Sequence, residues 1–468
     1  MSGAPELKEN LRFVFRLTLI LLGSQVASYL GVAALYYSVA IVVGGLRIAR
    51  RPVEALWVGI VLLAVTSQMY PIGLDELGTS LSGAYRPYIL VIATVAIAMV
   101  AGQDFRSAKT YNWRRSLSRN VRVRFAVLVA VLFLALASGY YASVTTPGLL
   151  DALRECSGWL TLVIFIFLGY GLSLTSAQAK RAFIRLHLSV LVYSGFFLAK
   201  FVYISQSLGA DQTAAGYGYS QRDMAFFSGL ALVLLIGQAL TSKVKRDWRT
   251  VWPAGFILVF AVLLTGSRSV LLCVLMVTLL FILIRRERTR LRVILLGVAG
   301  ILAVSVVSSW DFASQDGLIG YVSSRFLVAS TEDSSLLSRA SEIEAVVEAI
   351  RESPILGQGP FFSYSFLDPI VGWKDTTFVD SGLGYLLMKS GLMGTCMFIW
   401  FAVDLLKMVR ALRTAFPSLI EVVFGSFMFY LVFLPFGPSF FVFQHSWFIG
   451  LLVGQSILVG SKFTLSRR

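Results

Sequence analysis

Histidine and cysteine are both scarce in this chain of 468 residues. It contains 2 histidines and 3 cysteines, and the cysteines (Cys156, Cys273 and Cys396) stand at spacings that match no zinc site, redox motif or disulfide framework. Two histidines do not favour a histidine-built metal centre. We therefore expect no metal site built from histidine or cysteine.

Charged side chains are scarce as well, at 14% of the chain against 57% hydrophobic residues, and the mean hydropathy is +0.77. Soluble domains are about half apolar and about a quarter charged, so this composition excludes a soluble multidomain enzyme. Acidic residues are scarcer than basic ones: the chain has 25 Asp and Glu against 41 Lys and Arg, which gives a net charge of +16. On so apolar a chain, the excess of bases indicates a polytopic membrane protein with basic loops on one side.

Fourteen apolar stretches reach or approach the length of a membrane-spanning helix, which is about 20 residues. The first two are almost contiguous and the ninth is short, so the sequence predicts an all-α polytopic membrane protein with 12–14 transmembrane helices, of which 14 is the favoured number. We expect residues 1–468 to form one integral membrane domain with one large extracytoplasmic loop at 311–382. The fourteen stretches are 11–29, 31–46, 53–70, 87–101, 125–144, 159–174, 183–204, 224–240, 251–265, 270–284, 293–310, 383–406, 419–436 and 441–459.

The distribution of charge tests this arrangement independently. With a cytoplasmic N-terminus, the cytoplasmic segments hold 31 of the 41 bases and a net charge of +23, and the rest of the chain holds −7. This asymmetry follows the positive-inside rule and predicts that both termini are cytoplasmic. The basic, aromatic stretch 106–124 is then a cytoplasmic loop facing anionic lipid, and we expect membrane lipids and no nucleic acid as partners.

The long loop contains a predicted helix. Ser341 and Glu344 have the spacing of a capping box, which places the start of a helix at Ser341. Pro354 and the glycines after it predict its end. An apolar stripe at helical spacing would give this helix one apolar face for the membrane surface or a cavity; its members are Ile343, Val346, Val347 and Ile350.

Ten bases lie outside the predicted cytoplasmic segments, where the positive-inside rule disfavours them. Arg268 occupies a tight outward turn, Arg222 directly precedes the eighth span, and Arg339 lies just before the predicted loop helix. Arginines gathered at one outward site would bind a multiply charged anion such as a diphosphate. Lys200 and Lys389 lie deeper within spans, where ionisable groups usually face a cavity. Snorkelling to the lipid surface remains an alternative for each of these five residues.

Three motifs resemble those of the O-antigen ligase and O-antigen polymerase (Wzy-type) superfamily. TGSRSVLL at 265–272 resembles its arginine turn, SRASEIEAVVEAIRESPILGQGP at 338–360 its large-loop motif, and VDSGLGYLLMKSGLMG at 379–394 its closing motif. Their order along the chain also agrees. The resemblance covers about 220–395 and matches Arg268 to the turn arginine, Arg339 to the loop arginine and Arg222 to an arginine before an earlier span.

This resemblance implies a metal-independent glycosyltransferase with a GT-C-like fold, without a cofactor. Such enzymes take a glycan from undecaprenyl diphosphate on the outer side of the bacterial plasma (inner) membrane. A ligase transfers it to lipid A core, whereas a polymerase joins it to another lipid-linked repeat unit. The chain also lacks an Asp-x-Asp motif for a metal-bound nucleotide sugar, which favours a lipid-linked donor.

Asp380 departs from the ligase pattern, in which histidine is typical at this position. The difference favours a polymerase of O-antigen or exopolysaccharide synthesis. Asp380 is the candidate base for the acceptor hydroxyl, and capping of the following span is the alternative role. Arg268 and Arg339 would act in catalysis, and Arg222, Arg268, Arg339, Lys389 and Lys200 would bind the diphosphate.

Two other functions remain alternatives: an O-antigen ligase-like transferase, and a transporter of lipid-linked oligosaccharide. Transporters usually show internal repeats between their two halves. A single large loop breaks such a symmetry and so argues against a transporter. The expected partners are the lipid-linked donor and acceptor, together with the chain-length regulator and flippase of the same pathway. Tyr364, Phe366 and Trp373 in the loop are candidates to stack on sugar rings or to pack in its interior.

Overall fold

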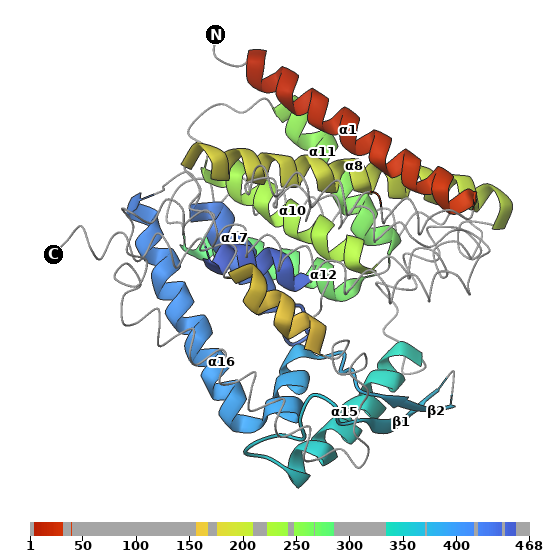
Figure 1. Ribbon diagram of the computed structural model, residues 1–468, viewed down its shortest axis with the longest axis vertical. Helices are drawn as coiled ribbons and strands as arrows, with labels where there is room; N and C mark the ends of the chain where they lie inside the picture. Colours follow the sequence, from red (N-terminus) through yellow and green to blue (C-terminus); the bar gives the residue numbers. More distant parts are fainter. Residues whose placement is uncertain are drawn as a thin grey trace. The chain divides into compact units, whose positions relative to one another are not determined.

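The computed structural model describes residues 4–30, 39, 156–166, 176–208, 222–241, 248–265, 267–284, 334–369, 372–415, 420–441 and 445–454. This part of the chain is mostly helical, with one small sheet (Figure 1). Its elements are α1 (Ala4–Tyr29), α8 (Ser176–Leu208), α10 (Arg222–Thr241), α11 (Trp248–Leu264), α12 (Arg268–Ile284), α15 (Ser334–Glu352), β1 (Tyr364–Asp368), β2 (Gly372–Thr376), α16 (Gly382–Ala415) and α17 (Ile420–Phe433).

Within the described residues, two helices are long and apolar enough to cross a membrane, Ile184–Gln206 and Gly382–Lys407. Shorter apolar helices coincide with several of the other expected spans: Cys156–Ile166, Met224–Gly237, Pro253–Leu264, Arg268–Phe281, Val423–Phe433 and His445–Gly454. The helical character of the chain is therefore confirmed. The number of spans stays a prediction, because the stretches 53–70, 87–101, 125–144 and 293–310, and all of 31–46 except residue 39, lie outside the described residues.

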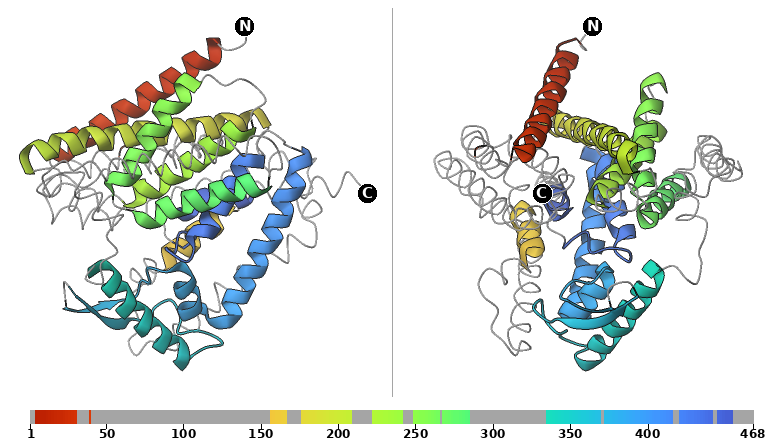
Figure 2. Two further views of the ribbon diagram at one scale, coloured as in Figure 1. Left: turned by 180° about the vertical axis from the view of Figure 1, so that it is seen from behind. Right: turned by 90° about the vertical axis from the view of Figure 1, so that its right-hand side faces the viewer.

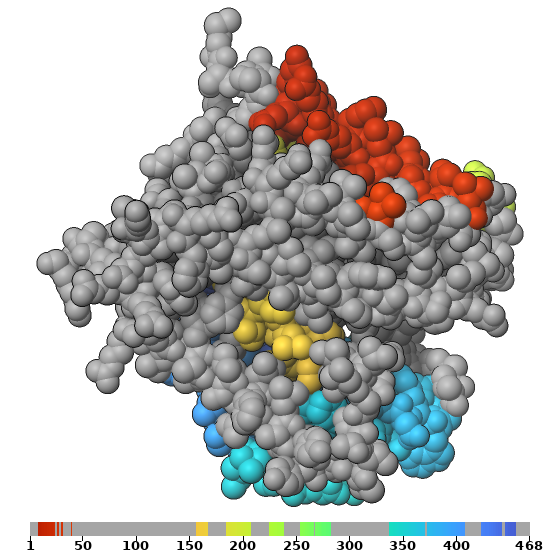
Figure 3. Space-filling model, in the orientation of Figure 1, coloured from red at the N-terminus to blue at the C-terminus, as the bar shows by residue number. Residues whose placement is uncertain are grey.

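The first helix, α1, presents apolar side chains at the surface (red in Figure 3). Five exposed residues repeat at helical spacing along it: Leu11, Phe15, Leu19, Leu22 and Val26. An exposed apolar stripe of this kind is typical of a helix whose outer face meets lipid or another apolar surface.

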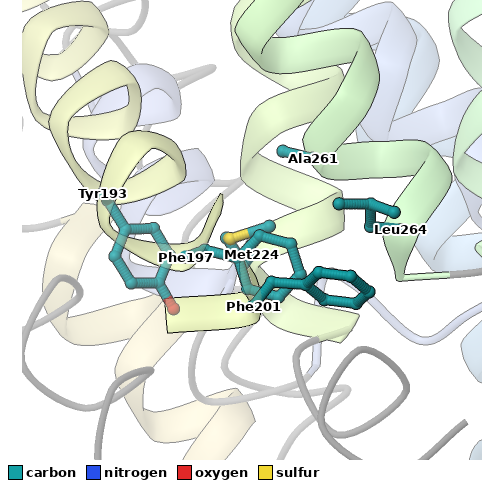
Figure 4. Packing of buried hydrophobic residues seen from close by; sticks show 6 residues of the cluster. All are labelled: Tyr193, Phe197, Phe201, Met224, Ala261 and Leu264. Carbon is teal, nitrogen blue, oxygen red and sulfur yellow. The ribbon is translucent and has the colours of Figure 1, made fainter. Parts of the chain in front are cut away.

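The chain forms two compact units. The first comprises Met1–Gly23, Arg181–Ser330 and Phe424–Val432, and in it α10 packs against α11 and α12. Gly229 permits this approach, because a Cβ atom there would lie 2.4 Å from a methyl carbon of Val270. Apolar side chains from α8, α10 and α11 fill the interior (Figure 4): Tyr193, Phe197, Phe201, Met224, Ala261 and Leu264.

The second unit comprises Ser24–Lys180, Thr331–Val423 and Phe433–Arg468. Its core is aromatic: the Trp159 indole stacks on Phe441 with 4.1 Å between ring centroids and donates a 3.2 Å hydrogen bond to the Tyr385 hydroxyl. Tyr385 in turn stacks on Phe441, with 5.5 Å between the ring centroids. Tyr385 belongs to the first turn of α16, so this core anchors the end of the helix that follows Asp380.

An antiparallel hairpin of β1 and β2 lies in this unit, and α15 packs against β1 (Figures 1 and 2). The sequence predicts only helices, and the hairpin corrects that prediction. Tyr364 and Phe366 alternate with exposed residues along β1 and are buried. Burial of one face of β1 against α15 explains why these few residues form a strand.

Candidate functional site

Helix α15 begins at Ser334, earlier than the capping box indicated. Ser341 and Glu344 are interior residues of this helix, so the predicted helix start is wrong, and Arg339 lies within α15 rather than before it. No glycine or proline occurs between Ser334 and Glu352, so nothing in the local sequence interrupts the extra turns. The predicted end is confirmed, since the helix stops at Glu352 just before Pro354.

The buried face of α15 is offset from the predicted apolar stripe. Ile343 and Val347 are 57% and 41% exposed, whereas Val346 and Ala349 are buried together with Glu342, which is only 6% exposed. Glu342 occupies this face because its carboxylate has two hydrogen-bond donors. Oε1 accepts a 2.8 Å bond from the Tyr364 hydroxyl and a 2.9 Å bond from the backbone N–H of Asp380.

These hydrogen bonds join α15, β1 and the segment before α16 through Glu342, Tyr364 and Asp380. We call these three residues the Asp380 cluster, together with Arg339, whose charge acts on the Glu342 carboxyl. Burial raises the pKa of the Glu342 carboxyl, while the bonds from Asp380 and Tyr364 and the charge of Arg339 act in the opposite direction. Burial and the negative charge of Glu342 also raise the pKa of the Tyr364 hydroxyl, which remains a hydrogen-bond donor at neutral pH. The cluster thus places one arginine and two carboxyl groups at the junction of α15 with the start of α16.

Asp380 itself is half-buried, and it does not cap α16. The cap is Ser381, whose Oγ accepts a 3.2 Å hydrogen bond from the N–H of Gly384. A hydroxyl bonded to an amide in the first turn is the usual arrangement for an N-cap. The side chain of Asp380 is therefore not used as the helix cap, and its role as a base stays a prediction.

The glycine-rich loop after α15 binds a break in α16. Gly391 has φ 63° and ψ −170°, which interrupts the helix and exposes backbone groups. Loop residues use them: the N–H groups of Gln358 and Gly359 donate to the carbonyls of Met388 and Lys389, at 2.7 and 3.0 Å. The carbonyls of Pro354 and Ile355 accept bonds in return from Leu392 and Met393, at 2.9 and 3.1 Å.

Two glycines permit this backbone contact. A Cβ atom on Gly357 would lie 2.5 Å from the nitrogen of Gly391, and one on Gly391 would lie 2.2 Å from the carbonyl oxygen of Ile355. Both distances are too short for any side chain. The glycines of the large-loop and closing motifs therefore serve one contact, which joins the end of α15 to α16.

Lys389 stabilises the same contact. Its side chain is fully buried, and Nζ donates hydrogen bonds of 2.9 and 2.7 Å to the carbonyls of Pro360 and Phe362. The ammonium group thus holds the loop to α16 in this structure, and diphosphate binding by Lys389 stays a prediction.

The other predicted site residues belong to the first unit. Arg268 is the first residue of α12 and is half-buried, and Ser267 precedes it as the cap residue, with its carbonyl accepting a bond from Leu271. Lys200 lies in α8 and is half-buried. Arg222 begins α10, and its side chain lies outside the described residues. Arg339 and Asp380 belong to the second unit, so the gathering of the two sets of residues at one site stays a prediction.

Glu342 was not identified from the sequence, and Tyr364 was identified only as a candidate to stack on sugar rings or to pack in the loop interior. A signal existed for both, since Glu342 shares helical spacing with Val346 and Ala349, and Tyr364 shares the two-residue spacing of a strand with Phe366. Of the three aromatic residues considered for sugar stacking, Tyr364 and Phe366 are buried, and Trp373 is 75% exposed. In the described part of the chain, no three His, Cys, Asp or Glu side chains are grouped as a metal site would require.

A family model described as O-antigen ligase (Wzy_C) matches residues 253–399 of this chain. The matched segment includes α12, α15, the hairpin and the broken part of α16, and with them all three sequence motifs. A search of curated proteins gives no match. Residues 253–399 are therefore similar to the O-antigen ligase family, in agreement with the resemblance of the three motifs to the O-antigen ligase and polymerase superfamily.

Proposed function

We propose that this protein is a polymerase that joins undecaprenyl-diphosphate-linked oligosaccharide repeat units on the outer side of the bacterial plasma membrane. The family domain supports the coarser statement, a membrane glycosyltransferase of ligase or polymerase type. The observation that carries the proposal is the bond between Glu342 and the backbone of Asp380, which brings the helix bearing Arg339 to the candidate base. Both termini would be cytoplasmic and the active site would face outward.

The proposed reaction needs a base and a cationic site for the leaving group. The acceptor hydroxyl oxygen attacks the anomeric carbon of the donor glycan and transfers its proton to the Asp380 carboxylate. The bond between that carbon and the diphosphate oxygen breaks, and undecaprenyl diphosphate leaves with the electron pair. Arg339 and Arg268 would stabilise the negative charge that develops on the diphosphate, so that no metal is required.

Asp380 also favours a polymerase over a ligase, because histidine is typical of ligases at the matching position. The diphosphate leaving group needs no general acid in either reaction, so a base for the acceptor hydroxyl is sufficient. The ligase remains the second candidate, since the matching family model carries that description.

The lipid-linked glycans of a deletion strain distinguish the two functions. Loss of a polymerase leaves single repeat units on undecaprenyl diphosphate, whereas loss of a ligase leaves long polymer that has not been transferred. Elongation of lipid-linked repeats by the purified protein in detergent would also exclude a role limited to transport. We expect single repeats in the strain and elongation by the protein.

Arg339→Ala in the complemented strain tests the assignment of the site. We expect a loss of elongation of about 10²-fold or more, as when one charge-stabilising donor is removed from an enzyme. Arg351→Ala is the matched control, because Arg351 lies exposed in the last turn of the same helix. Normal polymer from a membrane-inserted Arg339→Ala variant would contradict the assignment.

A further inference from the structure

We propose that Glu342 and Tyr364 are positioning residues, which hold the backbone of Asp380 in the place required for proton transfer. The inference rests on the proposed function, in which Asp380 is the base. It adds two residues that neither the sequence motifs nor the family match assigns a role.

A single carboxylate oxygen carries this arrangement. Oε1 of Glu342 accepts from the Tyr364 hydroxyl at 2.8 Å and from the Asp380 N–H at 2.9 Å, and Glu342 and Tyr364 are 6% and 7% exposed. The Tyr364 hydroxyl is also 2.9 Å from the carbonyl oxygen of Phe378. One oxygen on α15 therefore links β1 to the segment that leads from β2 into α16.

The backbone of Asp380 is fixed on both sides. Before it, Val379 is 1% exposed, and the Asp380 N–H is bound to Glu342. After it, Ser381 caps α16 through its side chain, and its carbonyl accepts a 2.7 Å bond from Tyr385. Asp380 itself is only half-buried, so its carboxylate can meet a substrate while its main chain stays in place.

The chemical character of Glu342 also indicates function. A buried carboxylate is costly unless it is well bonded, and an apolar residue at this point of α15 would avoid that cost. Glutamate instead provides a charged acceptor, which makes stronger hydrogen bonds than a neutral one. Displacing a catalytic group by about 1 Å lowers the rate by about 10²-fold. The rate gained by holding Asp380 in place therefore explains why a buried carboxylate occupies position 342 despite its cost in stability.

The test is a comparison of variants of the full-length purified protein, with lipid-linked repeats from the deletion strain as donor and acceptor. Glu342→Met removes the acceptor at similar length, Glu342→Gln keeps it, and Tyr364→Phe removes only the hydroxyl. We expect kcat to fall by about 10²-fold in Glu342→Met with little change in KM, and to return to within about 10-fold of wild type in Glu342→Gln. We expect an intermediate loss in Tyr364→Phe.

Matched controls and a double variant separate positioning from a general loss of structure. Glu344→Met changes an exposed glutamate of the same helix and should leave kcat unchanged. Asp380→Asn should retain only a small residual rate of transfer, and adding Glu342→Met should lower that residual rate no further, because Glu342 acts through Asp380. Additive losses would overturn the proposal, as would full kcat in a folded Glu342→Met variant. Full activity in Asp380→Asn would instead contradict the base assigned under the proposed function.

Discussion

Lys389 illustrates at the residue scale how one sequence position suits two roles. A lysine within an apolar helix is a candidate ligand for an anion, because ionisable groups in spans usually face a cavity. In the structure the break at Gly391 leaves backbone groups without helical partners, and the loop that binds there brings the Pro360 and Phe362 carbonyls to the ammonium group. Hydrogen bonds to a charged group contribute about 1.5–3 kcal/mol each, which offsets the cost of burial. Lys389 therefore stabilises the junction of loop and helix.

Lys389→Met tests this role, because it removes both hydrogen bonds and keeps a side chain of similar length. We expect a loss of unfolding free energy of about 2–4 kcal/mol, seen as a lower thermal midpoint in detergent. Lys407→Met is the control, since Lys407 is exposed on the same helix. If Lys389→Met unfolds like wild type but requires much more donor for half-maximal rate, diphosphate binding is the better interpretation.

At the scale of elements, the junction between the loop and α16 depends on backbone shape more than on side chains. Gly391 has a backbone conformation that only glycine adopts without strain, and its Cα faces the Ile355 carbonyl directly. Such a junction aligns the end of α15 with α16 over several hydrogen bonds. The junction therefore fixes the position of α15 relative to α16, and the Asp380 cluster connects the same two helices at their other ends.

Gly391→Ala should disrupt this junction. Both the strained backbone and the 2.2 Å approach of the new Cβ to a carbonyl oxygen oppose the native structure, so we expect a destabilisation of more than about 2 kcal/mol and loss of elongation. Gly195→Ala is the matched control, because Gly195 lies in α8 and, among the described residues, no atom beyond its chain neighbours and the nearby backbone of its own helix lies within 4 Å of the added carbon. Thermal unfolding of both variants measures the difference, and equal midpoints would show that the junction is not required for stability.

The elements also show what could be predicted from the sequence. The end of α15 was predictable, because Pro354 acts on its neighbours in the chain. The hairpin and the break at Gly391 depend on partners elsewhere in the chain: β1 packs against α15, and the loop at 354–359 binds the backbone at the break. Glu342 escaped prediction for the same reason, since its donors come from β1 and from the start of α16.

At the scale of the whole molecule, the distribution of the few acidic residues indicates the orientation of the chain in the membrane. The net charge of +16 divides into +23 on the predicted cytoplasmic segments and −7 elsewhere, and the segment 253–399 that matches the family model contains the predicted outward loop. A lipid-linked glycan donor outside the cell requires that loop to be outside. The orientation of the chain is therefore a condition of the proposed function, and it can be tested separately from activity.

Labelling of single cysteines in intact cells with a membrane-impermeant maleimide tests this orientation. Cys396 is exposed, so the background variant carries Cys396→Ser, whereas Cys156 and Cys273 are buried and can remain. Glu344→Cys places a thiol on the exposed face of α15, and Ser116→Cys places one in the predicted cytoplasmic segment 102–124. We expect Glu344→Cys to be labelled in intact cells and Ser116→Cys only after the inner membrane is opened. The reverse pattern would place α15 in the cytoplasm, where it could not meet a donor on the outer side, and the proposed polymerase function would fail with it.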